Sequence, residues 1–354
     1  MFGGIVKKTA FVLVAAVTSL VLSSCGAPEG QSNGGSAGGS GELKIACSQQ
    51  EAFCQKMTEA FTKETGIKAN HVRLGAGEVL ARLKTNKGEF DVWSGGQAEN
   101  HLIAQREGNV EPYVSDAASK LPAEFNSGDG AWSGFYTDSI GFCSSEKELD
   151  RIGAEAPTSW DDLLDPKLQG KISMPHPATA GVGYMVLYTV LQKFDGDQGK
   201  TIDFMKKLNN NIVQYSKSAA TSTQMVGRGE AAVGIALDSD CAQAKHEGFS
   251  DLKNTYPSEG TGYEVGAVSL LKGAKNVDQA KKYFDWILSQ QTQDQFGDVP
   301  SFAAPTHPDA KLGEDVPDQK SVNKVTWDVS QAADKRQELN SLFESEVKSS
   351  GEAK

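Results

Sequence analysis

Short apolar runs alternate with segments of helical periodicity along most of the 354-residue chain. Residues 43–46 form a strand-length apolar run, and Phe53, Met57 and Phe61 then recur at the spacing of one helix face. The alternation of short strands with amphipathic helices continues toward the C-terminus. It predicts an α/β fold.

The other predicted elements follow the same pattern. Further strands are expected at residues 67–72, 90–93, 172–174, 212–215, 232–237 and 265–271. Further helices are expected at residues 78–83, 98–107, 184–194, 202–208 and 280–288, and around Leu339, Leu342, Phe343 and Val347. Ser48 and Glu51 have the spacing of a capping box, so the first helix is expected to be capped by Ser48 and ended by Gly66.

The roughly 310 residues after position 41 are enough for two lobes with separate cores. An aromatic-rich extended stretch at residues 132–142 is interpreted as the first crossover between them, and the strand at 265–271 as the return. The predicted divisions are a signal peptide at 1–24, a tether at 25–41, the first part of lobe 1 at 42–138, lobe 2 at 139–262, and the return to lobe 1 with C-terminal helices at 263–354.

The N-terminal segment carries export signals. Residues 10–22 form an apolar run after two lysines, with the length of a signal-peptide core rather than of a membrane span. The sequence Leu22-Ser23-Ser24-Cys25 resembles the lipobox of bacterial lipoproteins, which implies that Cys25 becomes a lipidated first residue after cleavage. An ordinary secreted protein is the alternative. Residues 26–41 are nearly all small and polar, as in a flexible tether.

The net charge is −11, and about −13 once the two lysines of the signal segment are removed. Such an acidic surface disfavours nucleic acid and does not favour anionic lipid. Membrane attachment is therefore expected through the lipid on Cys25. No other long apolar run follows residue 22, so the mature chain is not expected to span a membrane.

Four further cysteines suggest disulfides in an oxidising compartment. The short loop between Cys47 and Cys54 favours that pair, which leaves Cys143 with Cys241. Zinc is the alternative use of such a set, but the sequence has no C-x-x-C and its five histidines lack ligand spacing. We expect no metal and no cofactor.

Several turns of small polar residues stand between a strand and a helix start. They are Ser48-Gln49, Gly75-Ala76-Gly77, Ser94-Gly95-Gly96 and Thr179-Ala180-Gly181-Val182-Gly183. Turns of this kind line the crevice at the carboxyl ends of the strands in open α/β sheets, with helix N-terminal N–H groups pointing into it. Together they favour a site that holds a phosphate or carboxylate without any arginine. The alternative is that each turn is only a helix cap.

Enzyme motifs are absent from the sequence, which has no G-x-S-x-G elbow, H-E-x-x-H or P-loop. The loose G-x-G-x-x-A match at 227–232 precedes a strand, the reverse of a dinucleotide-binding fingerprint. Asp161 and Asp162 lie at a helix start and are interpreted as caps. Asp238 and Asp240 directly follow a buried strand, where a side chain can reach a crevice.

Several blocks resemble the solute-binding proteins of ATP-driven importers, in the branch that includes ferric-ion, aminoethylphosphonate and sugar-phosphate binders. The blocks are Cys47–Glu51 with Cys54, Asp91–Gly96, Thr158–Leu164, Gly170–Pro175, Pro177–Gly181 and Glu259–Gly266. The resemblance implies a two-lobed, type II periplasmic-binding-protein fold. Each lobe would be a mixed sheet flanked by helices, and a two-strand hinge would join the lobes and close them on one small ligand.

The same resemblance bears on the ligand. Ferric binders of this branch use adjacent tyrosines after the strand that leaves the second lobe, but residues 237–241 contain none, so only a carboxylate iron site stays open. Sugar-phosphate members carry a His-Asp pair there and a glutamate in a Gly-Tyr-Glu block. Asp240 and Glu264 match, whereas Ser239 departs from the histidine. The match implies carboxylates that accept hydrogen bonds from ligand hydroxyls or an amine, opposite amides that hold an anionic end.

The predicted function is capture of a small phosphorylated or phosphonate anion for import through an ABC permease. We expect a monomeric binding protein, not an enzyme, held outside the cell membrane by its lipid. The predicted ligand-binding residues are Ser48, Gln49, Gly75, Gly77, Ser94, Gly95, Thr179, Ala180, Gly181, Tyr215, Asp240, Tyr263 and Glu264. A ferric-iron receptor of the same fold is the first alternative, and an extracellular phosphate-ester hydrolase is the second.

Overall fold

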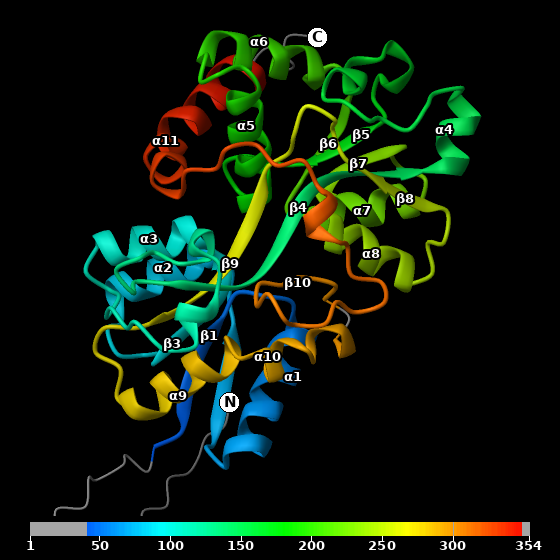
Figure 1. Cartoon of the computed structure of the whole chain (residues 1–354). Coiled ribbons are helices and arrows are strands. Elements are labelled where there is room, and N and C mark those ends of the chain that lie inside the picture. Colours follow the sequence, from blue (N-terminus) through cyan, green and yellow to red (C-terminus); the bar gives the residue numbers. More distant parts are fainter. Residues whose placement is uncertain (1–40, 300, 349–354) are drawn as a thin grey trace, which may run out of the picture. The chain divides into compact units, whose positions relative to one another are not determined.

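The computed structural model describes residues 41–299 and 301–348 (Figure 1). The predicted signal peptide, Cys25 and all but the last residue of the predicted tether lie outside these described residues. Within the described ranges, none of the helices is both long and apolar enough to cross a bilayer.

One run of hydrogen-bonded strands passes through two sheets in the order β2-β1-β3-β9-β4-β7-β5-β6, and β8 and β10 also pair with β4. The strands are β1 Leu43–Cys47, β2 Ala69–Arg73, β3 Val92–Gln97, β4 Ser133–Ser145, β5 Ile172–Pro175, β6 Ile212–Ser216, β7 Val233–Leu237, β8 Leu252–Thr255, β9 Tyr263–Leu270 and β10 Ala304–Pro305. β1 is parallel to β2 and β3, and β5 is parallel to β6 and β7. β9 is antiparallel to β3, and β4 to β7, so both sheets are mixed, as predicted.

β4 changes its partner halfway along its length. Residues 133–139 pair with β9, whereas residues 140–145 pair with β7 and β8. Every residue of β4 is buried. β4 and β9 therefore run side by side where the two sheets meet (Figure 1).

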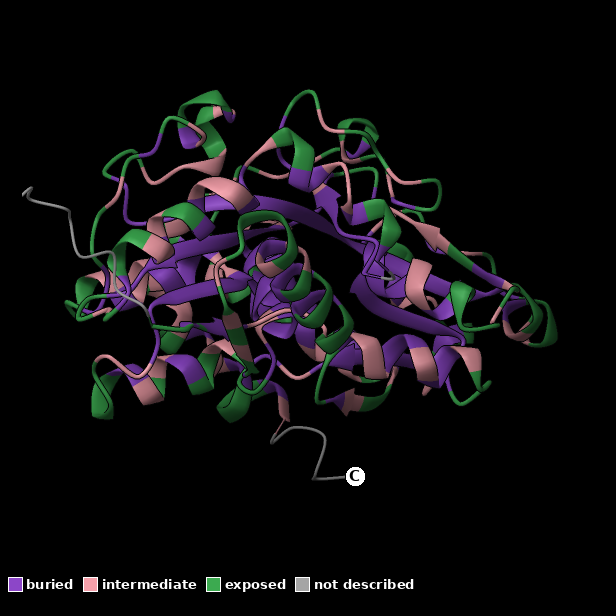
Figure 2. Ribbon diagram, turned by 90° about the horizontal axis from the view of Figure 1, so that it is seen from below, coloured by how far each residue is buried: buried purple, intermediate pink, exposed green. Residues whose placement is uncertain are grey.

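The helices cover the faces of these sheets. They are α1 Glu51–Thr65, α2 Ala76–Thr85, α3 Ala98–Arg106, α4 Glu146–Ile152, α5 Gly181–Lys193, α6 Gln198–Asn209, α7 Ala219–Gly227, α8 Asp238–His246, α9 Val277–Ile287, α10 Gln290–Gln293 and α11 Val329–Leu342, which continues as a π-helical turn over Phe343–Lys348. Figure 2 shows most strand ribbon buried, while the helices expose one side. The predicted α/β class is confirmed, although the helices α4, α7, α8 and α10 and the strands β8 and β10 were not predicted.

The start of α1 differs from the sequence prediction. The helix begins at Glu51 after Gln50, which makes no side-chain cap, so the capping box predicted at Ser48 is wrong. Ser48 Oγ instead accepts a 2.9 Å hydrogen bond from Trp93 Nε1. The helix ends at Gly66 as predicted, with φ 72°.

Two main clusters of buried apolar side chains form the core. One packs α1 and α9 on β1, β3 and β9 through residues such as Phe61 and Phe284. The other packs α5 and α6 on β5 and β7 through residues such as Leu187 and Met205. Leu339 of α11 belongs to this second cluster, together with Phe343 and Val347, so the C-terminal helix packs with residues of the predicted lobe 2.

Both predicted disulfides are confirmed. Cys47 at the end of β1 is bonded to Cys54 in α1. Cys143 in β4 is bonded to Cys241 in the first turn of α8. One bridge therefore joins β1 to the first turn of α1, and the other joins β4 to the first turn of α8.

Candidate ligand-binding site

A cavity of about 320 Å³ is lined by residues from both sheets. Many of them follow the carboxyl ends of β1, β2, β6 and β7, where strand-to-helix turns are expected to build a site. The lining consists of Ser48, Gln49, Gln50, Arg73, Tyr136, Asp138, Val182, Ser218, Ala219, Ala220, Thr223, Gln224, Leu237, Ser239, Asp240, Gln243, Ala244, Glu247 and Glu264. Four of the predicted ligand residues, Ser48, Gln49, Asp240 and Glu264, are among them.

Helix N-termini from both sheets contribute to this lining. Residues 48–50 lead into α1, and residues 218–220 form the start of α7. Ser218 caps α7 by accepting a 3.2 Å hydrogen bond from the Thr221 N–H. The first N–H groups of a helix have no intrahelical acceptor, and the helix dipole is positive at that end. This part of the cavity is therefore suited to a negatively charged group.

The contribution of α7 to the lining was not predicted from the sequence. The signal was the small polar turn Ser216-Lys217-Ser218 directly after a predicted strand. It was not recognised because α7 has few apolar residues at helical spacing; Met225 and Val226 are its large buried side chains.

Arg73, at the end of β2, is the one cationic side chain among the described residues that line the cavity. Its Nε donates a 3.2 Å hydrogen bond to the carbonyl oxygen of Gln49, so its guanidinium is held beside the loop that leads into α1. The lining therefore adds a guanidinium to turns that were expected to hold an anion without one.

Ser94 and Gly95 lie behind the cavity rather than on its lining. Gly95 has φ +89°, and a Cβ on it would lie 3.1 Å from the carbonyl carbon of Ser48. Gly96 has φ +82°, and a Cβ on it would lie 3.2 Å from the Cβ atoms of both Ser48 and Ala76. These glycines let the C-terminal part of β3 pack against the Ser48 turn, so the turn predicted at Ser94-Gly95-Gly96 is part of the strand. The Ser94 hydroxyl is paired with the Tyr283 hydroxyl at 3.1 Å.

The remaining predicted turns lie outside the lining. A Cβ on Gly75 or Gly77 would meet nothing within 4 Å, so their substitution is sterically permitted. Of the turn that opens α5, Val182 reaches the lining, while Thr179, Ala180 and Gly181 do not. A Cβ on Gly181 would lie 2.5 Å from Gln97 Nε2.

The two predicted tyrosines are also outside the lining. The Tyr215 hydroxyl donates to Asn209 Oδ1 at 2.8 Å, and its ring packs edge-on against Phe343. The Tyr263 ring packs near Trp327, and Lys324 lies over it. Their surroundings are those of packing residues.

Buried carboxyl groups form the other part of the site. Asp138, Asp240 and Glu264 line the cavity with 2%, 8% and 7% exposure, and Asp238 lies behind them at 0%. Glu264 Oε1 accepts from the Tyr136 hydroxyl at 2.9 Å, and its Oε2 accepts from Gln97 Nε2 at 3.0 Å. Asp138 and Tyr136 were not predicted, since both lie inside a fully buried strand without a motif.

Burial and mutual repulsion shift the titration of these groups. Burial raises the pKa of Asp240 to about 7, and the charges of Glu264 and Asp238 add to the shift. Burial likewise raises the pKa of Glu264 to about 7. The pKa of Asp138 is raised well above its usual range by burial and by the charges of Asp238, Glu264 and Asp240. Near neutral pH the cavity can therefore present protonated as well as charged carboxyl groups.

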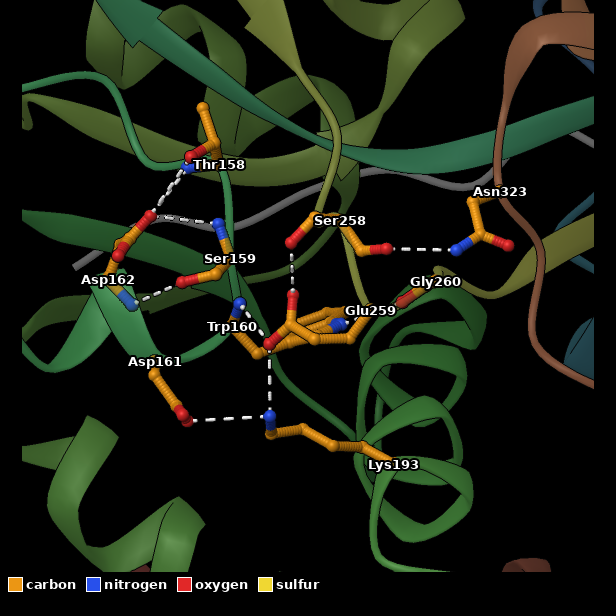
Figure 3. A network of polar contacts seen from close by, with 10 residues as sticks. All are labelled: Thr158, Ser159, Trp160, Asp161, Asp162, Lys193, Ser258, Glu259, Gly260 and Asn323. Carbon is orange, nitrogen blue, oxygen red and sulfur yellow. Dashed lines mark hydrogen bonds and ion pairs between the residues drawn. The ribbon is translucent and has the colours of Figure 1, made fainter.

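Two of the sequence blocks contact each other away from the cavity (Figure 3). Trp160 Nε1 donates to the carbonyl oxygen of Gly260 at 3.0 Å, and the Trp160 N–H donates to Glu259 Oε1 at 3.2 Å. Lys193 Nζ pairs with Glu259 at 3.0 Å and with Asp161 at 3.5 Å. These blocks tie the segment after α4 to the segment before β9, which is a structural role.

Asp162 behaves as predicted for a capping residue. Its Oδ2 accepts from the backbone N–H groups of Thr158 and Ser159 at 2.8 and 2.9 Å. Ser159 Oγ in turn accepts from the Asp162 N–H at 3.1 Å. The pair Asp161 and Asp162 is therefore not part of the cavity.

Comparison with known proteins gives the family. The model of the bacterial extracellular solute-binding protein family matches residues 99–332. An uncharacterised protein of Haemophilus influenzae is 35% identical over 284 residues, which cover 78% of this chain and 81% of that protein. A putative 2-aminoethylphosphonate-binding periplasmic protein of Salmonella typhi is 27% identical over 73% of this chain and 75% of its own length.

A solved structure is similar over almost the whole described chain. The periplasmic binding protein AfuA of Actinobacillus pleuropneumoniae, with fructose 6-phosphate bound, has a TM-score of 0.80 and 32% identity, covering 87% of this chain and 98% of that one. Proteins of this kind bind solutes for ABC importers and are not enzymes, so the predictions of type II fold and of a binding role are confirmed. The chain belongs to the bacterial extracellular solute-binding protein family, whose members work outside the cytoplasm with a membrane permease.

Proposed function

We propose that this protein captures a small phosphorylated or phosphonate solute in the 320 Å³ cavity and delivers it to its ABC permease. One observation carries the proposal: the N-terminal turns of α1 and α7 line the same cavity as Arg73. Amide groups at two helix starts and a guanidinium together supply the donors that a phosphate or phosphonate group requires.

The named relatives support this ligand class. AfuA is described with fructose 6-phosphate bound, and the Salmonella typhi protein is named for 2-aminoethylphosphonate. Both ligands join a phosphorus-containing anion to an end that carries hydroxyl or amino groups. The cavity has a corresponding composition, since the carboxyl groups of Asp138, Asp240 and Glu264 lie on the same lining as the helix starts.

A ferric ion has less support. In the described ranges, no group of three or more His, Cys, Asp or Glu side chains is arranged to hold a metal ion. The tyrosine on the lining, Tyr136, donates its hydroxyl to Glu264. The backbone amides of the helix starts also suit an anion rather than a cation.

Closure of two lobes on the solute would complete capture. We place the lobes at residues 42–138 and 263–354 on one side and 139–262 on the other, with the C-terminal helices partly on the second. β4 pairs with β9 up to Ser139 and with β7 from Ile140 onward. This exchange of partners supports a hinge at the boundary between the two residues. A solute that contacts both lobes shifts the open–closed equilibrium by its differential affinity for the closed form.

We further propose that a lipid on Cys25 anchors the monomeric protein beside its permease. Sixteen residues of small polar composition would give a reach on the order of 20–25 Å from the membrane. A Cys25→Ser variant is expected in the soluble extracytoplasmic fraction. If the variant stays in the membrane fraction, the anchor is not a lipid on this cysteine.

A ligand screen tests the proposed function. Thermal unfolding of the purified protein is followed with phosphate esters, phosphonates, polyols and ferric salts, and hits are titrated by calorimetry. Phosphate esters or phosphonates are expected to raise Tm by several degrees, since ligand binding to the native state alone stabilises it. A shift with ferric salts but with none of the organophosphorus anions would overturn the proposal.

A further inference from the structure

Asp138 carries a buried carboxyl oxygen that the fold does not satisfy. The residue lies on β4 next to Ser139, the last residue that pairs with β9. It is 2% exposed and lines the cavity. Within the described part of the chain, its Oδ1 accepts no hydrogen bond.

Two neighbouring carboxyl groups, those of Asp238 and Glu264, differ in this respect. Asp238 Oδ1 accepts from the N–H groups of Ser139 and Ser239, and its Oδ2 accepts from Tyr256 and Gln319. Both oxygens of Glu264 are also bonded, as described above. Buried polar atoms in proteins are normally paired, so an orphaned one in a ligand cavity points to a partner supplied by the ligand.

The charges around Asp138 define what that partner is. Asp238, Asp240 and Glu264 raise the local negative potential, and the Ser239 side chain favours the charged form of Asp138. Lys324 lies near enough to Asp138 and Asp238 to feel their charges, but it is not on the lining. A further anion would be repelled at this place, whereas an O–H or N–H donor would be bound.

We propose that Asp138 is a specificity-determining residue, which accepts a hydrogen bond from a hydroxyl or ammonium group of the solute. The protein would then select phosphate or phosphonate anions that carry such donors over simple anions of the same charge. This inference rests on the proposed function and adds to it how the hydroxyl or ammonium end of the solute is recognised. It assigns Asp138 a contact that Asp240 and Glu264 alone would not provide.

Calorimetric titrations with five probes test the inference. Inorganic phosphate and methylphosphonate lack the donors, glycerol 3-phosphate and fructose 6-phosphate carry hydroxyls, and 2-aminoethylphosphonate carries an ammonium group. The wild type is expected to bind at least one donor-bearing probe about tenfold or more tightly than the two simple anions. Equal affinities would overturn the inference, and absence of binding to all five would overturn the proposed function as well.

Variants of Asp138 then locate the effect. Asp138→Ala is expected to lower affinity for the donor-bearing probe about tenfold or more and to leave that for inorganic phosphate within about twofold. Asp285→Ala is the matched control, because Asp285 on α9 also has a buried carboxyl oxygen without a hydrogen-bond partner in the described residues but is not on the lining, and it should change neither affinity. Equal losses for both classes of probe, or no loss, would overturn the inference.

Asp138→Asn keeps the shape of the side chain and covers the case in which Asp138→Ala does not fold. It removes the negative charge that Asp138 can take up opposite a bound ammonium group, so an ammonium-bearing solute should lose most of its advantage over inorganic phosphate. A hydroxyl-bearing solute should retain part of its advantage, because the amide oxygen still accepts a hydrogen bond. If both kinds of solute keep their full advantage in Asp138→Asn, Asp138 does not determine specificity.

Discussion

The Tyr136 hydroxyl donates a 2.9 Å hydrogen bond to Glu264 Oε1, across the strands β4 and β9 that run side by side where the sheets meet. Gly266, opposite Tyr136 in the register, makes this bond possible. A Cβ on Gly266 would lie 1.9 Å from the Tyr136 ring. Gly266 therefore leaves the space in which the Tyr136 ring packs, and the hydroxyl of that ring donates to the carboxyl group of Glu264.

Replacement of Gly266 by alanine should displace Tyr136 and release Glu264. We expect the free energy of unfolding to fall by about 1–3 kcal/mol, as for other overpacked core positions. Solute affinity should fall as well, because Glu264 loses one of its two partners. Denaturant unfolding and calorimetry measure the two effects.

Tyr136→Phe is the control for this substitution, since it keeps the ring and removes the hydrogen bond. It should reproduce part of the affinity loss with a smaller loss of stability, about 1 kcal/mol. If Gly266→Ala leaves both stability and affinity unchanged, Tyr136 does not depend on this glycine.

Arg73 should matter for the anionic part of the solute. Because a charge-assisted hydrogen bond contributes about 1.5–3 kcal/mol, Arg73→Gln is expected to weaken binding of the identified phosphate or phosphonate about 10- to 100-fold. Its Tm should change little, since the side chain is exposed. Arg82→Gln is the matched control, because Arg82 on α2 pairs with Glu78 of the same helix and with Glu89 beyond its end and is not on the lining. Equal affinity of both variants would argue against an anion beside Arg73.

The raised pKa of Asp240 predicts a pH-dependent stability difference. Its pKa is about 7 in the folded protein against 3.8 ordinarily, so the folded state holds an extra proton between these values. Raising the pH through this range therefore destabilises the folded state. Asp240→Asn removes this effect and should be more stable than wild type at pH 8, by on the order of 1–3 kcal/mol, but not at pH 4.

Thermal unfolding of the ligand-free wild type and Asp240→Asn across this pH range measures the difference. Comparison of the two proteins cancels other titrations, such as that of His101, whose pKa burial lowers to about 4. A stability difference that does not vary with pH would show that Asp240 is already charged in the folded protein at low pH.

The bridge between Cys47 and Cys54 should support binding as well as stability. It closes a short loop that contains Ser48 and Gln49, two lining residues. Replacing both cysteines with alanine is expected to lower stability by about 2–3 kcal/mol by the loop-entropy relation, and to lower solute affinity because the loop loosens. Unfolding and titration under non-reducing conditions measure both. Loss of stability with unchanged affinity would mean that the disulfide stabilises the fold but does not position the binding loop.

Sequence periodicity located most of the fold because the strands are short apolar runs that become fully buried, as β5 and β7 illustrate. It missed α8, whose first turn is Asp238-Ser239-Asp240 and whose buried apolar side chains are only Cys241 and Ala244. A helix that begins with polar residues aimed at a cavity has little amphipathic signal.

The site was predictable only in part. Ser48, Gln49, Asp240 and Glu264 were found because they follow strands or match a family block. Asp138 was not predicted because its neighbours Asp240 and Glu264 are distant in sequence. Since every residue of β4 is buried, its sequence does not indicate which side chains line the cavity. Tyr215 was predicted to contact the ligand. Its packing against Phe343 could not be foreseen, because that contact depends on how the distant C-terminal helix packs.

Amide NMR spectra during titration with the solute found in the screen test the central claim most directly. A bound anion should move the backbone N–H signals of Ser48 and Gln49 before α1 and of Ala219 and Ala220 in α7, with smaller changes on outer helices such as α9. Saturable shifts at both helix starts would support one anion held between the sheets. Shifts confined to other surfaces, with both helix starts unchanged at saturation, would contradict the account.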